Sequence, residues 1–130
     1  MFIEVYVDGA SAGHPGFSGV GIYLKTPHGS ESYSLPIGIT NNNEAEFMAV
    51  IKGMELCISK EITSVSFRTD SELVERAVDQ EFTKNKSYMP YLEKIISLKK
   101  HFDLFFIKWI PTKQNLHADA LAKKAIRMNE

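Results

Sequence analysis

Hydrophobic and polar positions alternate with a period of two at the start of the chain. Between residues 2 and 8, every odd-numbered residue is aliphatic, and Asp8 is the last polar residue on the opposite side. This alternation predicts a half-buried β-strand that ends at Asp8. Glycine and proline then interrupt the pattern until alternation returns in residues 19–26. We therefore expect a β-hairpin.

A third strand and a helix are predicted next. Residues 31–38 have β character, and Pro36 marks the end of this short strand because proline cannot donate to a sheet ladder. Asparagine side chains then offer helix caps before apolar residues recur at helical spacing. These apolar residues are Phe47, Val50, Ile51, Met54 and Cys57. The pattern predicts a helix over about residues 43–59.

The second half of the chain alternates between strands and helices. Residues 63–69 predict a strand, and Thr69 has the spacing of a capping box with Glu72, which places Asp70 at a strand-to-helix junction. A helix that opens at Ser87, a strand over 103–110 and a last helix over 116–126 follow. We expect one domain with an α/β fold, a mixed five-stranded sheet with helices on both faces.

Composition and charge narrow the classes of function. The chain has 130 residues, of which 44% are hydrophobic and 24% charged, as in ordinary single-domain soluble proteins. Its longest apolar runs are far shorter than the ~20 residues of a membrane span, so we expect neither membrane insertion nor secretion. The single cysteine fits a reducing cytoplasm. A net charge of −1 argues against binding nucleic acid through bulk positive charge.

Four carboxylates are candidates for one site. Asp8 and Asp70 each follow a strand, and they emerge at the same sheet edge if those strands are parallel neighbours. Glu46 and Asp119 occupy first turns of predicted helices and can point toward the same crevice. Taken singly, each acid also fits a turn, an N-cap or a helix-dipole position. Spacing alone leaves both interpretations open.

A cluster of these acids requires a counter-ion. Carboxylates a few ångströms apart raise one another's pKa until a proton or a cation intervenes. Mg²⁺ is the natural partner because it prefers carboxylate, water and phosphate oxygens. Two such ions ~3.5–4 Å apart can activate a water and stabilise the leaving oxygen of a phosphodiester. Phosphodiester hydrolysis is the reaction class that follows.

Four motifs resemble the type 1 ribonuclease H family over residues 7–125. They are VDGASAGHPGFSGVG, NNNEAEFMAV, RTDSELV and NLHADALA. The resemblance implies a ribonuclease H-like fold and an endonuclease that cuts the RNA strand of RNA/DNA hybrids with two Mg²⁺ or Mn²⁺ ions. It implies Asp8, Glu46, Asp70 and Asp119 as catalytic metal ligands. We expect the protein to be a monomer in the cytoplasm.

The resemblance also implies substrate contacts. These are Gly9, Ala10, Ser11, His14, Asn42 and Asn43, whose backbone and side-chain groups can reach the 2′-hydroxyls that only RNA offers. His14 stands where the family commonly has asparagine. His117 lies only two residues before Asp119, so we interpret it as part of the helix start and not as the histidine that many family members use for product release.

Other conspicuous residues have simpler interpretations. The chain lacks the basic handle that some relatives insert between the second and third helices. Lys84 and Lys86 in this segment are interpreted as solvated charges, while Lys113 can add a phosphate contact. Phe105, Phe106 and Trp109 lie in an apolar strand and are interpreted as core or helix-packing residues, not as base-stacking platforms.

Two other functions remain open on the sequence. One is a hybrid- or RNA-binding module that retains the carboxylates but cleaves weakly or not at all. The other is a nuclease of the wider superfamily with a different substrate, which the spacing of the motifs makes less favoured.

Overall fold

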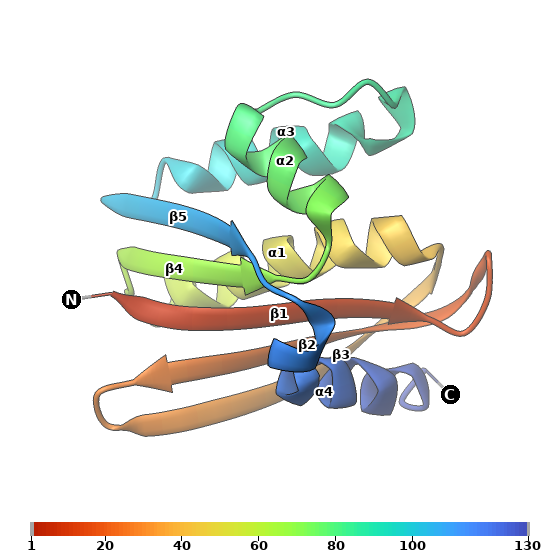
Figure 1. The fold of residues 1–130 in the computed structure, drawn as a ribbon, viewed down its shortest axis with the longest axis horizontal. Coiled ribbons are helices and arrows are strands. Elements are labelled where there is room, and N and C mark those ends of the chain that lie inside the picture. Colours follow the sequence, from red (N-terminus) through yellow and green to blue (C-terminus); the bar gives the residue numbers. More distant parts are fainter. Residues whose placement is uncertain (1, 130) are drawn as a thin grey trace.

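The computed structural model describes residues 2–129, which form a five-stranded mixed sheet with helices on both faces (Figure 1). The strands are β1 (Ile3–Ser11), β2 (Gly16–Thr26), β3 (Gly29–Thr40), β4 (Ser64–Thr69) and β5 (Leu104–Trp109). The helices are α1 (Asn42–Ser59), α2 (Glu72–Gln80), α3 (Met89–Lys99) and α4 (Leu116–Ile126), with single 3₁₀ turns η1 (Lys86–Tyr88) and η2 (Thr112–Gln114). The expected α/β class and number of strands are confirmed.

The order of strands across the sheet is β3-β2-β1-β4-β5. Strand β1 pairs antiparallel with β2 and parallel with β4, and Tyr6 is opposite Arg68 in the last pair of the parallel ladder. Asp8 and Asp70 each lie two residues beyond that pair. Because side chains alternate between faces along a strand, the two aspartates continue the same register on one face of the sheet.

Strand β1 is longer than its sequence predicts. It does not end at Asp8 but continues to Ser11, which is opposite Ser18 in β2. The expectation of a strand end at Asp8 is therefore wrong. Only the pairing with β4 ends near Asp8, while pairing with β2 continues along the other side of the strand. The pattern of residues within β1 does not show where the pairing on each side ends.

Strand β3 also continues past its predicted end. Pro36 is opposite Gly19, and the pairing register shifts between Ser18 and Gly19, so that Gly38 is the next paired residue. Because β3 is at the edge of the sheet, one side of its backbone needs no partner, and a proline at a bulge is tolerated there. The expectation that Pro36 ends the strand is wrong.

The helices begin close to their predicted positions, with one different cap. Asn41 caps α1 in a capping box with Glu44. Ser71, not Thr69, caps α2, because its side chain accepts from the Val74 N–H. The predicted capping box at Thr69 is wrong, and the Thr69 hydroxyl instead accepts from the Ser71 N–H. The strand-to-helix junction at Asp70 is confirmed.

The main core lies between the sheet and α1, and it includes Cys57 as expected. The last strand is less buried than its apolar sequence suggests. Phe106 is 54% exposed and Trp109 is 41% exposed, so the core alternative is wrong for these two residues, whereas Phe105 is half-buried beside Phe67. Within residues 2–129, none of the helices has the length and apolar character of a membrane span.

Helix α4 lies directly on the sheet backbone, on the face opposite α1 (Figure 1). A Cβ atom on Gly21 would lie 2.1 Å from the Ala118 carbonyl oxygen, and one on Gly19 would lie 2.5 Å from the Ala122 carbonyl oxygen. Side chains at these glycines would push the helix away from the sheet. The close approach therefore fixes the height of α4, which includes Asp119, above β1 and β2.

Replacing Gly21 with alanine tests this close contact. The new methyl group would meet backbone rather than a flexible side chain, so we expect Gly21→Ala to lower the free energy of unfolding by about 1–3 kcal/mol. Urea unfolding followed by circular dichroism measures the loss. Ser30→Ala, at an exposed position on β3, is the control and should change stability by less than about 0.5 kcal/mol. Equal stability of the Gly21→Ala variant and the parent chain would contradict the account.

Candidate metal centre

Two carboxylates of the site come from neighbouring parallel strands. Asp8 is in β1 and is only 4% exposed, and Asp70 directly follows β4. The Trp109 indole N–H donates to the Asp70 carbonyl oxygen over 3.2 Å, which holds the chain where it leaves β4. Backbone geometry alone therefore brings these two acids together at one sheet edge.

Glu46 reaches the same place from α1. A Cβ atom on Gly9 would lie 2.1 Å from the Ala45 carbonyl oxygen, so only glycine permits α1 to approach β1 this closely. The Gly9 N–H then donates to Glu46 Oε1 over 2.7 Å. This charge-assisted hydrogen bond orients the glutamate toward the strand.

Oxygen atoms of Asp8, Glu46 and Asp70 lie within 4.8 Å of one another. The convergence that the sequence left conditional is thus present for these three acids. Glu44, by contrast, belongs to the helix cap and accepts from the Asn41 N–H and the Tyr91 hydroxyl.

Asp119 approaches from the other face of the sheet, in the first turn of α4. Its side chain is close enough to Asp8 to help raise the pKa of Asp8. Asp119 also forms an ion pair of 2.9 Å with Lys123, one turn further along the helix. The buried Asn115 side chain donates to the Val7 carbonyl oxygen over 2.9 Å and ties the start of α4 to β1.

The electrostatics of the cluster are unfavourable without a cation. Burial, and then the charges of Glu46 and Asp70, raise the pKa of Asp8 well above its ordinary value. Burial, and then the charge of Asp70, raise the pKa of Glu46 to about 7, although the hydrogen bond from Gly9 opposes this. The folded chain thus concentrates negative charge that water no longer solvates.

This donor set fits a divalent cation. Within residues 2–129, no lysine, arginine or histidine forms an ion pair with Asp8, Glu46 or Asp70. Hard oxygen ligands with no internal counter-ion are what Mg²⁺ or Mn²⁺ prefers, and carboxylate-only sites do not suit softer metals. Asp119 differs because Lys123 already neutralises it in part.

The predicted substrate-contact residues gather beside the carboxylates. Gly9, Ala10 and Ser11 end strand β1, and the Ser11 N–H donates to Asn42 Oδ1 over 3.0 Å. The His14 ring Nε2 lies 3.4 Å from the Asn42 amide nitrogen, and both residues line a hollow of about 380 Å³. The structure thus places His14 beside Asn42.

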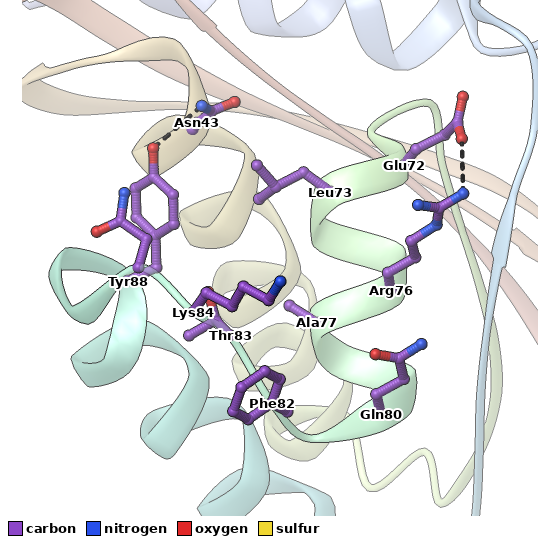
Figure 2. A pocket seen from close by; sticks show the side chains of 11 residues that line it. Asn43, Glu72, Leu73, Arg76, Ala77, Gln80, Phe82, Thr83, Lys84 and Tyr88 are labelled. Atoms are coloured by element: carbon purple, nitrogen blue, oxygen red, sulfur yellow. Dashed lines mark hydrogen bonds and ion pairs between the residues drawn. The ribbon is translucent and has the colours of Figure 1, made fainter.

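A larger groove of about 700 Å³ lies between α2 and the start of α3 (Figure 2). Asn43 and Tyr88 close one end, where the Asn43 amide donates to the Tyr88 hydroxyl over 3.1 Å. Figure 2 shows Leu73 and Phe82 along its walls, with Arg76 paired to Glu72 at the rim. This groove adjoins the carboxylates because Asn43 lies one turn before Glu46.

His117 does not face the carboxylates. Its ring stacks on Tyr23 with centroids 3.9 Å apart, and its Nε2 lies 3.0 Å from the Ser32 hydroxyl. A role as a loop histidine for product release therefore finds no support in its position.

Sequence analysis missed two residues that act on the site. Lys123 could have been found from its i, i+4 spacing to Asp119 on a predicted helix. Trp109 could not, because its hydrogen bond to Asp70 joins segments that are distant in the sequence.

Comparisons with known proteins agree over nearly the whole chain. A family profile described as reverse transcriptase-like matches residues 6–125. The Enterococcus faecalis protein EbsB, whose name assigns it provisionally to the hydrolases, is 37% identical over 96% of this chain and 94% of its own length. A protein of Bartonella quintana named ribonuclease H is 34% identical over 95% of this chain and 88% of its own length.

Solved structures resemble the fold closely. The crystal structure of ribonuclease H1 from Halobacterium salinarum superposes with a TM-score of 0.91 at 30% identity, covering 98% of this chain and 99% of that one. LC11 ribonuclease H1, solved in complex with an RNA/DNA hybrid, superposes with a TM-score of 0.87 at 29% identity, covering 97% of both chains.

The raised pKa values predict how stability changes with pH when no metal is bound. Glu46 has an ordinary pKa near 4.5 and a folded-state pKa of about 7, so its stabilising contribution is complete below pH 4.5 and is lost as pH rises through 7. Asp8 acts in the same direction. We expect Glu46 alone to cost the metal-free chain on the order of 3 kcal/mol of stability between these limits.

Asp8→Asn separates this effect from general pH sensitivity. The variant removes one charge from the cluster, so in the presence of a chelator it should be more stable than the parent chain near pH 8, with a weaker pH dependence. Mg²⁺ should raise the melting temperature of the parent chain and not that of the variant. Thermal unfolding at several pH values measures both effects, and identical pH profiles for the two proteins would contradict the account.

Proposed function

This chain belongs to the ribonuclease H family, and on that premise we propose that it hydrolyses the RNA strand of RNA/DNA hybrids as a metal-dependent endonuclease. The observation that supports this most strongly is the convergence of Asp8, Glu46 and Asp70 oxygens within 4.8 Å of one another. The relative LC11 ribonuclease H1 was solved with an RNA/DNA hybrid. This chain thus combines a cluster of carboxylates with a fold that, in a relative, accommodates the hybrid.

Two Mg²⁺ or Mn²⁺ ions are the proposed cofactors. Asp8 and Asp70 would be shared ligands, with Glu46 on one ion and Asp119 on the other. Bound divalent cations lower the pKa of an attacking water and stabilise charge on the leaving oxygen. The buried position of Asp8 keeps water from competing for its carboxylate, and the Gly9 N–H fixes which Glu46 oxygen remains available.

The residues around the carboxylates would position the RNA strand. The backbone of Gly9, Ala10 and Ser11 follows Asp8 directly, and Asn42 is hydrogen-bonded to Ser11. Together with His14, these groups offer donors and acceptors to 2′-hydroxyls in the wide minor groove of the hybrid. Such contacts distinguish RNA from DNA at the strand that is cut.

The second strand would lie in the groove of Figure 2. Asn43 lies between the proposed positions of the RNA strand and the second strand of the hybrid, because it lines both this groove and the hollow beside His14. In this groove, Arg76 and Lys84 would contact phosphates and Leu73 would contact sugars. None of these contacts would be to the edges of bases. Affinity independent of sequence follows from such contacts.

A monomer in the cytoplasm is the proposed state of the protein. Cys57 is fully buried and unpaired, which fits a reducing compartment. The active-site residues named above all come from one chain, so the proposed chemistry needs no second copy.

Asp70→Asn tests the proposed activity. Because Asp70 would contact both ions, we expect cleavage of end-labelled RNA in a hybrid to fall by at least about a thousandfold in Mg²⁺ or Mn²⁺. Asp119→Asn should lose less, because this acid is already paired with Lys123. Internal RNA products, and no cutting of duplex DNA or duplex RNA, are expected from the parent chain.

The matched control is Asp103→Asn, an exposed aspartate just before β5 begins, at the opposite edge of the sheet from the carboxylates. It should cleave at the parent rate. Saturable hybrid binding without product would favour a binding module, and products from strand ends alone would favour an exonuclease. Cleavage by Asp70→Asn at the parent rate would show that the assigned roles are wrong.

A further inference from the structure

Half of one sheet face is left open by α4. The strand registers place Tyr6 opposite Arg68, and Glu4 opposite Lys25, so their side chains share the face on which α4 packs. Figure 1 shows α4 crossing the sheet beside the second half of β1, away from the first half of β1 and from β4 and β5. We name this area the open sheet face: Phe2, Tyr6, Lys25, Arg68, Phe106 and Lys108.

Aromatic rings and cations alternate across the open sheet face. Phe2 and Phe106 are 43% and 54% exposed, with ring centroids 5.5 Å apart. The Tyr6 ring has Lys25 Nζ 5.3 Å from its centroid and the Arg68 guanidinium carbon at 5.5 Å. The Arg68 guanidinium also donates to the Tyr6 hydroxyl over 3.1 Å. The rings are thus held in place before any ligand arrives.

Two shallow hollows lie along this face. One of about 260 Å³ lies among Phe2, Arg68 and Phe106, and another of about 230 Å³ lies among Tyr6, Lys25 and the His117 ring. Flat π-systems that line shallow hollows suit stacked bases, because every base has a π-face. Sheets with exposed aromatic residues are a known form of single-strand recognition.

The charge of the face is opposite to that of the whole chain. Lys25, Arg68 and Lys108 contribute three cations against the single carboxylate of Glu4, whereas the chain has a net charge of −1. Exposed lysines beside the rings can neutralise phosphates. A second copy of the chain is a poorer occupant, because a two-fold contact would bring the same cations against one another.

The face is continuous with the carboxylates. Tyr6 precedes Asp8, and Arg68 precedes Asp70, by two residues on the same side of their strands. Two residues of a β-strand span about 7 Å, so a nucleic-acid strand held at the site can extend directly onto the rings. By the proposed function, the strand held there is RNA.

We infer that the open sheet face binds single-stranded RNA, the unpaired continuation of the RNA strand that lies at the carboxylates. Bases stack on Phe2 and Phe106, and phosphates contact Lys25 and Lys108. The inference rests on the proposed function for the choice of RNA. It adds a site for unpaired RNA to a chain that would otherwise contact only the hybrid.

Fluorescence anisotropy with a labelled uridine oligomer tests the inference in a chelator, where no cleavage occurs. We expect Phe106→Leu, which keeps apolar area but removes the ring, to weaken binding about tenfold. Phe106→Tyr, which keeps an aromatic ring, should bind with the affinity of the parent chain. Lys25→Glu combined with Lys108→Glu should weaken binding further and make the affinity less dependent on salt. The control Lys94→Glu, on the exposed side of α3, should bind as the parent does.

Two outcomes would overturn the inference. One is equal affinity of the parent and both face variants, and the other is equal loss with Lys94→Glu. Sedimentation tests whether a second copy of the chain covers the face instead. A parent chain with the mass of a dimer would assign the face to a second copy if Phe106→Leu keeps the dimer and Phe106→Ala loses it. Cleavage of a hybrid without an unpaired extension is measured in parallel. Its absence would contradict the proposed function without changing the affinity for single-stranded RNA.

Discussion

The parallel register between β1 and β4 is the constraint on which the site depends. Asp8 and Asp70 lie just beyond the last pair of this ladder, Tyr6 opposite Arg68, and the backbone hydrogen bonds of the ladder keep the two acids close despite their mutual repulsion. Close approach at glycines then brings one further acid from each face of the sheet. The free energy of the sheet and core therefore opposes the repulsion, and binding of cations relieves it.

Much of this arrangement is predictable from local pattern. Alternation and helical spacing give the elements, and four short motifs identify Asp8, Glu46, Asp70 and Asp119 as candidates. The errors occur where pairing decides the outcome. Strand β1 passes Asp8 because β2 pairs with it beyond β4, and β3 tolerates Pro36 because it is an edge strand with a bulge. Such facts depend on neighbours that a single segment does not reveal.

The exposed aromatic residues illustrate the same limit. Apolar residues in β5 predict burial, but burial requires a covering element, and α4 packs on β1, β2 and β3 instead. Phe106 is therefore exposed on the open sheet face. Trp109 lies on the other face of β5, where it is partly exposed beside Asp70. The position of α4 places Asp119 near the other carboxylates and leaves the adjoining open sheet face uncovered. The packing of this one helix therefore determines both the site and the surface beside it.

Anomalous X-ray diffraction from crystals grown with Mn²⁺ tests the central claim most directly, because it locates the cation without relying on activity. We expect an anomalous peak among the carboxylates of Asp8, Glu46 and Asp70, with Mn–O distances of about 2.0–2.3 Å. Carboxylates turned apart, with Mn²⁺ bound elsewhere or not at all at saturating concentration, would contradict it.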